Sequence, residues 1–251
     1  VGLRMQLTGG GVQGDGTLEG NEEALVTYTD NLFIDQLRHA VRSAGKMSEQ
    51  RIPFSVRDEA MSGLRDWWAD RLDQSFFNQI CGNNAQTDTR YTGNQATIIP
   101  NAANYISAKA AATADESITS SDTMNLTVID KAVAAAKTLT PMIRPVKVEG
   151  MDKYVCFLHP YQVYNIRTAT TTGQWLDIQK AAMAGADSTK SPIYTGAIGE
   201  YNGVVLVESA RVATGVNSST AAAITTVRRA VLCGAQSAVF GTGREGGTPE
   251  K

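Results

Sequence analysis

Two glycine-rich stretches have the spacing of a phosphate-binding loop. Residues 9–14 read Gly-x-Gly-x-x-Gly after a predicted strand, and residues 241–246 repeat that spacing. In dinucleotide-binding folds such glycines open a helix whose backbone amides hold a pyrophosphate. The first stretch continues Asp-Gly-Thr-Leu-Glu-Gly, which is too glycine-rich and acidic to begin that helix, and the second has no room for one. We therefore expect a hairpin tip at 9–20 and no nucleotide site in either place.

The residues that could act as acids or bases are few and scattered. His159 precedes Pro160 at the end of a predicted strand, but no nucleophile elbow or second histidine lies close to it, so we predict a structural role. His39 lies in another predicted strand and is expected to serve in packing or at an interface. Asp66 and Asp70 are one helical turn apart and could share a proton in a cleft. Their helix predicts a solvated or inter-subunit face instead.

The cysteines and basic pairs do not indicate a reactive site either. Cys81, Cys156 and Cys233 are far apart without a Cys-x-x-Cys spacing, so buried reduced thiols are expected. Two histidines are too few for a multi-histidine metal site. The pairs at 38/42 and 228/229, all arginine, could contact phosphate or a neighbour's carboxylates, but neither is large enough for a nucleic-acid patch. We predict no catalytic residue, no cofactor-binding residue, no metal ligand and no cofactor.

The composition limits the classes of protein to which the chain can belong. The chain has 251 residues, of which 42% are hydrophobic, so a core can form. Its net charge of -2 and pI of about 5.8 argue against a dedicated nucleic-acid binder. No apolar run reaches the roughly 20 residues of a membrane span. Because the chain begins with Val1 and ends in a polar run, we expect it to be part of a longer gene product.

Residues 55–81 carry the strongest helical pattern. Ser55 is a good N-cap, Asp58 and Glu59 place negative charge in the first turn, and Gly82 is a natural stop. Such a helix is about 40 Å long, which suits a spine. Its apolar residues recur at intervals of four and are widened by two aromatic residues: Ala60, Leu64, Trp68, Leu72, Phe76 and Ile80, with Trp67 and Phe77. The spacing predicts that the aromatic residues pack in a core and do not form a ligand-binding box.

A long hairpin is predicted for residues 1–45. Residues 1–8 alternate apolar and polar as in a half-buried strand, residues 9–20 hold six glycines, and a second β-prone stretch covers about 24–41. Such a hairpin has little core of its own, so we expect it to lie on a neighbouring subunit.

The rest of the chain mixes helices and strands. Residues 83–123 are polar and predicted to be loops. Predicted helices are 126–139 (capped by Asn125, with Leu126, Ile129, Val133 and Ala136 on its apolar face), a short helix from Pro160, and 174–184. Predicted strands are 153–158, 204–208, 222–226, 230–232 and 238–240. Without regular βαβ alternation, the fold class is α+β.

Several multi-residue stretches share the pattern of one family. They are MQLTGGG (5–11), LEGNEEAL (18–25), QLRHAVR (36–42), GKMSEQR (45–51), WWADR (67–71), FFNQICG (76–82), LHPYQ (158–162) and VLCGAQ (231–236). With them the chain resembles the major capsid proteins of the N-4-like phages, which implies the HK-97 capsid fold. By this resemblance, 1–45 is the extended hairpin (E-loop), 46–124 the peripheral domain with spine helix 55–81, 125–235 mainly the axial domain, and 236–251 a return strand and C-terminal tail.

The resemblance also implies a function. It is that of a structural major capsid (head) protein of a tailed double-stranded DNA phage, which self-assembles into the hexamers and pentamers of an icosahedral shell. The implied partners are other copies of the chain, scaffold, portal and decoration proteins, and packaged double-stranded DNA bound without sequence specificity, with no membrane. The implied location is the virion, after synthesis in the host cytoplasm. Two alternatives stay open: an encapsulin-like bacterial compartment shell, and an α/β nucleotide-binding enzyme using the glycine-rich loop and His159.

Overall fold

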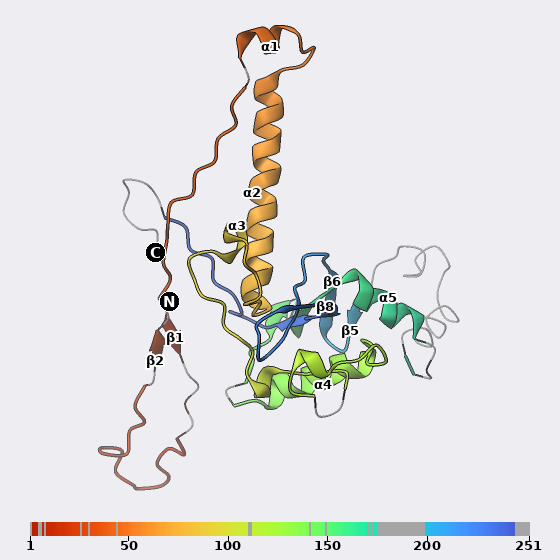
Figure 1. The fold of residues 1–251 in the computed structure, drawn as a ribbon. Helices are drawn as coiled ribbons and strands as arrows, with labels where there is room; N and C mark the ends of the chain where they lie inside the picture. The colour runs from red at the N-terminus through yellow and green to blue at the C-terminus, as the bar shows by residue number, and fades with distance from the viewer. Residues whose placement is uncertain are drawn as a thin grey trace.

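A computed structural model gives the fold of the chain (Figure 1). It describes residues 2–4, 7, 9–25, 27–29, 31–43, 45–109, 112–140, 142–148, 150–169, 171, 173–174 and 199–243. One long helix stands on a small body of sheet and helices, and an extended segment runs beside it toward the hairpin (Figure 1). Helices and sheets are mixed, as expected. None of the described helices combines the length and apolarity needed to cross a membrane.

The long helix α2 (Val56–Ile80) begins and ends where local signals predict. Ser55 is its N-cap, and the Ser55 side chain accepts a hydrogen bond from the Asp58 amide at 3.3 Å. At the other end Gly82 has a φ of 60°, and the amide of Asn83 donates to the carbonyl of Asn78 at 2.9 Å. This is a Schellman motif, in which a left-handed glycine lets the chain turn back on the last helical turn.

The core lies around one mixed sheet. Its strand order is β3 (Val146–Val148), β4 (Met151–Leu158), β6 (Val204–Glu208) and β5 (Glu200–Tyr201), and β9 (Val231–Cys233) also pairs with β4. Strands β4 and β6 are parallel, and the other pairs are antiparallel.

Helices cover the two faces of this sheet. Alternate strand residues point to the same face, and on β4 these are Tyr154, Cys156 and Leu158, which pack in one cluster with α4 (Leu126–Thr138) and α5 (Pro160–Thr168). Phe157, which points the other way, packs with Phe77 at the end of α2. The sheet therefore lies between the helix pair α4/α5 and the C-terminal end of α2.

The predicted elements of this body are mostly confirmed. Helix α4 is capped by Asn125, its four predicted apolar residues are buried, and α5 begins at Pro160. Strand β6 has its predicted bounds, while β4, β8 (Ala223–Arg228) and β9 differ by a few residues. The sequence missed β3, β5 and β7 (Thr214–Val216), which are only two or three residues long.

Two other predictions met different outcomes. The strand predicted at 238–240 is absent, because no described strand bonds to that segment. Of the helix predicted at 174–184, all but the first residue lies outside the described residues. The predicted loops at 83–123 contain only short helical turns: α3 (Thr89–Thr92), η1 (Ala102–Asn104) and η2 (Asp115–Ser117).

The predicted hairpin is only partly a β-structure. Strands β1 (Gly2–Arg4) and β2 (Thr27–Thr29) pair antiparallel, with Leu3 opposite Tyr28. The second predicted strand, at 24–41, is wrong beyond β2, because residues 31–43 are extended but have no neighbouring strand within the described part of the subunit. This segment then leads to α1 (Lys46–Gln50).

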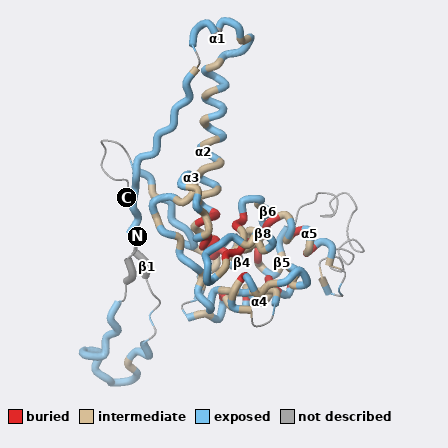
Figure 2. The backbone as a smooth tube through the Cα atoms, viewed as in Figure 1, coloured by how far each residue is buried: buried red, intermediate tan, exposed pale blue. Residues whose placement is uncertain are grey.

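The aromatic residues of α2 are not all in the core, contrary to the prediction. Only Phe77 is buried, with 3% of its surface exposed, whereas Trp68 and Phe76 are 38% and 39% exposed. The core predicted along the helix exists only at its C-terminal end. The rest of α2 is coloured as exposed (pale blue) or intermediate (tan) in Figure 2. Trp67 packs on His39, but Trp68, Leu72 and Phe76 stay exposed.

Candidate functional site

A buried carboxylate joins the end of α2 to the body. Asp115, at the start of η2, is 3% exposed and accepts three hydrogen bonds. They come from the Tyr105 hydroxyl at 2.9 Å, the Val216 amide at 2.8 Å and Arg229 Nε at 2.6 Å. A carboxylate removed from water needs this number of donors and a counter-charge to stay ionised.

Arg229 extends this junction to the helix. Its Nη1 donates to the carbonyl oxygens of Cys81 at 3.1 Å and Gly82 at 2.8 Å, which follow the last turn of α2. The guanidinium therefore satisfies carbonyls at the negative end of the helix dipole while it neutralises Asp115. The sequence left it open that Arg228 and Arg229 contact phosphate or a neighbour's carboxylates, and the structure shows that Arg229 is used within the subunit. No local pattern could have identified this pair, since its members are 114 residues apart.

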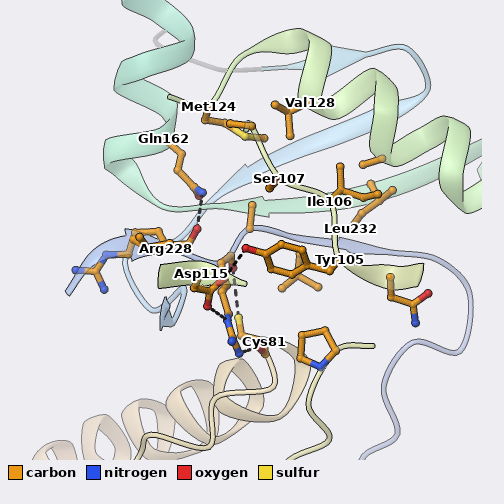
Figure 3. A pocket seen from close by; sticks show the side chains of 18 of the residues that line it. Cys81, Tyr105, Ile106, Ser107, Asp115, Met124, Val128, Gln162, Arg228 and Leu232 are labelled. Carbon is orange, nitrogen blue, oxygen red and sulfur yellow. Dashed lines mark hydrogen bonds and ion pairs between the residues drawn. The ribbon is translucent and has the colours of Figure 1, made fainter. Parts of the chain in front are cut away.

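A cavity of about 910 Å³ opens beside the junction. Figure 3 shows Asp115, Tyr105 and Cys81 gathered on one side of it and Met124 and Val128 on the other. Two acids line this cavity, Asp115 and Asp122. Asp115 is paired with Arg229, and Asp122 accepts hydrogen bonds from the amide and hydroxyl of Thr119. Burial raises the pKa of the Cys81 thiol to about 11, which keeps it protonated and a poor nucleophile near neutral pH.

The other thiols have the same character. All three cysteines are buried and free, as the sequence predicts. Burial raises the pKa of Cys156 to about 12, and it also raises the pKa of Cys233. None of the three thiols is therefore activated for catalysis or metal binding.

His159 is structural, as predicted. It is the N-cap of α5, and its Nδ1 accepts a hydrogen bond from the Tyr161 amide at 3.2 Å. The Gln162 side chain completes the capping box by accepting from the His159 amide at 2.9 Å. Burial, with the nearby charge of Arg228, lowers the pKa of His159, which keeps Nδ1 free to accept.

The acidic pair on α2 does not act as a pair. Asp70 forms an ion pair with Arg211 and accepts a hydrogen bond from the Tyr91 hydroxyl at 3.1 Å. It therefore ties α2 to two other segments of the same subunit, while its side chain stays 35% exposed, as on the predicted solvated face. Asp66 is exposed, as that prediction requires.

His39 and the glycine-rich tip complete the candidate residues. The His39 ring stacks on Trp67, with centroids 4.3 Å apart, so it packs the extended segment 31–43 against α2. Residues 9–25 contain no helix, so the helix needed to hold a pyrophosphate is missing there. Glu23 accepts a hydrogen bond from the Gly9 amide at 2.7 Å and closes the tip. No cluster of three potential metal ligands occurs among the described residues.

Two parts of the described chain expose several large apolar side chains. One part is the apolar stripe of α2, formed by the exposed residues Met61, Trp68, Leu72 and Phe76. Another lies on the extended segment, at Leu32, Phe33, Ile34, Leu37 and Val41. Large contiguous apolar surface on a folded subunit marks a contact with another protein. Sequence reasoning placed the stripe in a core because periodicity alone does not show which molecule covers it.

Comparison with known proteins agrees with a contact-forming subunit. The major capsid protein of Pseudomonas phage KPP25 is 27% identical over an alignment of 238 residues, and the match covers 82% of this chain and 58% of that protein. The capsid of Ralstonia phage GP4 has 33% identity and a TM-score of 0.68, and the match covers 84% of this chain and 60% of that one. The cyanophage Pam1 capsid shares the fold, with a TM-score of 0.58 at 18% identity over 84% of this chain and 61% of that chain.

These matches cover only part of each relative. The chain spans about three fifths of the length of the proteins just named. The pattern of the family described as "Phage capsid protein" matches residues 1–251. Because that match covers the whole sequence, the chain belongs to the phage capsid protein family.

Proposed function

We propose that this chain is the shell-forming part of the major capsid protein of a tailed double-stranded DNA phage. The observation that carries the proposal is the exposed apolar side of α2 and of segment 31–43, on a subunit whose own core lies at one end of α2. Copies of the chain would bury this surface against each other. Family membership supports the same role.

The proposed assembly is an icosahedral shell of hexamers and pentamers. Ring-forming contacts of this kind join different patches on neighbouring subunits. Permanent interfaces of this type bury more than about 2,000 Å². Other copies of the chain are the primary partners, scaffold, portal and decoration proteins are further partners, and the enclosed DNA is bound without sequence specificity. The proposed location is the virion.

The proposed HK-97-type domains follow the architecture. Residues 1–45 would be the E-loop, 46–124 the peripheral domain with α2 as its spine, 125–235 mainly the axial domain, and 236–251 a return strand and tail. The isolation of the hairpin from the core supports the first assignment, since β1 and β2 pair only with each other among the described strands. The cluster of α4, α5, β4 and β6 supports a separate compact unit within 125–235.

The test is electron microscopy of the purified chain with size-exclusion chromatography. We expect closed shells, or rings of five and six subunits. Deleting residues 9–22 should leave a folded subunit that no longer forms stable shells, because the hairpin tip adds nothing to the core. Wild-type shell yield from the deletion would refute the role of the hairpin. The proposed function would be refuted by a chain that stays monomeric both as it stands and after extension to the length of its relatives.

A further inference from the structure

Acidic and basic residues are separated along the first part of the chain. Residues 5–37 contain six acidic residues and no lysine or arginine. Residues 38–57 contain five arginines or lysines and one glutamate. A block of charges of one sign repels its own kind and attracts a surface of the opposite sign. These two blocks are therefore complementary to each other.

The two blocks present their charges at opposite ends of the molecule. Four of the six acidic residues lie in the hairpin tip, residues 9–25, which we call the acidic tip. Three of the five basic residues lie in α1 and the turn into α2, residues 46–57, which we call the basic end. Figure 1 shows the acidic tip at the bottom of the molecule and α1 at the top. The tip of a subunit therefore does not reach its own basic end, and the attraction has to act between two subunits.

Charged side chains at both ends are available for such a contact. Asp15 and Glu19 of the acidic tip are exposed, and so are Lys46, Arg51 and Arg57 of the basic end. None of these five side chains forms an ion pair with another described residue. Their charges are therefore not neutralised within the described part of the subunit.

Apolar side chains accompany the charges at both ends. Leu18 and Leu25 of the acidic tip, and Met47 and Phe54 of the basic end, each have more than half of their surface exposed. A contact between proteins has an apolar centre and a polar, charged rim. Both ends have the composition of one half of such a contact.

The acidic tip is closed before it meets a partner. Glu23 accepts a hydrogen bond from the Gly9 amide at 2.7 Å, and Glu22 accepts one from the Gly20 amide at 2.8 Å. A loop that is already held in shape loses less conformational entropy when it binds. The tip is therefore suited to dock as a preformed unit.

The charges also indicate which partner the tip meets. Two acidic tips, or two basic ends, would place charges of one sign together, which is unfavourable. A contact from tip to basic end joins opposite charges, and every copy of the chain carries one of each. Head-to-tail contacts of this type close into rings when the rotation between subunits allows it.

The spacing of the basic residues favours a protein partner over a nucleic acid. Segments that bind nucleic acid concentrate lysine and arginine in runs of about 5–8 residues. In the basic end, Lys46, Arg51 and Arg57 are spread over the whole segment, and Glu49 lies among them. This pattern suits separate ion pairs with the carboxylates of another subunit.

We propose that the acidic tip of one subunit docks on the basic end of a second copy of this chain, head to tail. This inference rests on the proposed function and deepens it, because it names the surface that receives the hairpin and the charges that hold it there.

Charge reversal in the complete chain tests this contact. Asp15→Lys with Glu19→Lys reverses two charges of the acidic tip (the tip variant). Arg51→Glu with Arg57→Glu reverses two charges of the basic end (the end variant). Each variant replaces attraction by repulsion at two positions, so each should weaken association at least about tenfold, measured by sedimentation velocity across a range of protein concentrations.

An equimolar mixture of the two variants should associate like the wild type. The reversed tip of one variant then meets the reversed end of the other, and the two unchanged ends also attract each other. Mixing cannot rescue a variant that has lost its fold, so recovery separates a lost contact from lost folding. Lys131→Glu with Arg144→Glu makes the same change in charge as the end variant at two exposed positions of the body, and this control should associate like the wild type.

The outcomes separate this inference from the proposed function. Shells that ignore both reversals, or a mixture that associates no better than its components, would overturn the docking and leave the shell-forming role intact. Association that follows the charges, but gives no rings or shells even after extension of the chain to the length of its relatives, would support the docking and overturn the shell-forming role. A duplex DNA fragment that binds the wild type but not the end variant, while the end variant still associates normally, would show that nucleic acid is the partner and overturn the docking.

Ionic strength gives an independent measurement on the unmodified chain. The screening length falls from about 30 Å at about 0.01 M salt to about 8 Å at about 0.15 M. Association of the wild type should therefore weaken as salt is added, and the end variant should depend less on salt. A wild type that does not associate at low salt, or whose association is unaffected by salt, would contradict the proposal.

Discussion

At the scale of single residues, the carboxylate of Asp115 stabilises the subunit because three donors converge on it. Replacing it with alanine leaves the side chain of Arg229, which is only 13% exposed, without its counter-charge. Removing one partner of a buried pair costs about 3–5 kcal/mol, so Asp115→Ala should lower the free energy of unfolding by that amount. Urea denaturation measures it.

An exposed ion pair provides the control for this prediction. Asp88 pairs with Arg90 at the surface, where water screens the interaction. Asp88 is also the N-cap of α3, so Asp88→Ala should lower the free energy of unfolding by the loss of one helix cap, which is less than the cost of Asp115→Ala. Equal effects of the Asp115 and Asp88 substitutions would contradict the role assigned to the junction.

His159 makes the stability of α5 dependent on pH. Its folded pKa lies below its ordinary value of about 6.5, so the unfolded chain takes up the proton first. Its contribution is complete above pH 6.5 and is lost as the pH falls through the lowered folded pKa. His159→Asn keeps an N-cap acceptor that does not titrate, and its free energy of unfolding should fall less between pH 7.5 and 5. Identical pH profiles of the two proteins would disprove this.

At the scale of elements, a glycine inside α2 and a glycine just after its C-terminal end should respond in opposite ways to the same substitution. Gly82 has a φ of 60°, and a Cβ there would lie 2.6 Å from the carbonyl oxygen of Ile98. Gly82→Ala should cost at least about 1–2 kcal/mol of unfolding free energy from backbone strain alone. Gly63 lies inside the helix with open space around it, so Gly63→Ala should stabilise the protein by about 0.5–1 kcal/mol. Thermal or urea unfolding that shows the same sign for both would contradict the structure.

How far an element could be predicted depends on where its determinants lie. The ends of α2 follow from Ser55 and Gly82, which act within a few residues, and the buried face of α4 follows from its periodicity. Both are local signals. The strand predicted at 24–41 is too long. β-Propensity shows that a segment can be extended, but it does not show whether another strand pairs with it.

The candidate functional residues divide in the same way, into those whose partners are near in sequence and those whose partners are distant. The structural role of His159 could be predicted, because its cap partners Tyr161 and Gln162 are neighbours in sequence. The pairing of Asp115 with Arg229 could not, because only the folded chain brings these residues together. The ion pair of Asp70 with Arg211 could not be predicted for the same reason, since Arg211 is 141 residues away.

At the scale of the whole molecule, stability and assembly depend on different parts of α2. The C-terminal end carries Phe77, which packs in the subunit core, while the apolar stripe of Met61, Trp68, Leu72 and Phe76 is exposed. A helix that contributes to its own core only at one end has surface left for a neighbour. Substitutions in the stripe should therefore separate folding from association, which ordinary core substitutions cannot do.

Leu72→Asp tests this separation. Leu72 is 43% exposed, so its replacement should change the free energy of unfolding by no more than about 0.5 kcal/mol, as for other surface sites. A charge buried in a subunit contact is costly, so assembly measured by light scattering should weaken at least about tenfold. Ser62→Asp adds the same charge to the same helix outside the stripe and should assemble normally. If Leu72→Asp also assembled normally, the stripe would not be a subunit contact; if it unfolded the isolated subunit, the stripe would belong to the core that the sequence predicted.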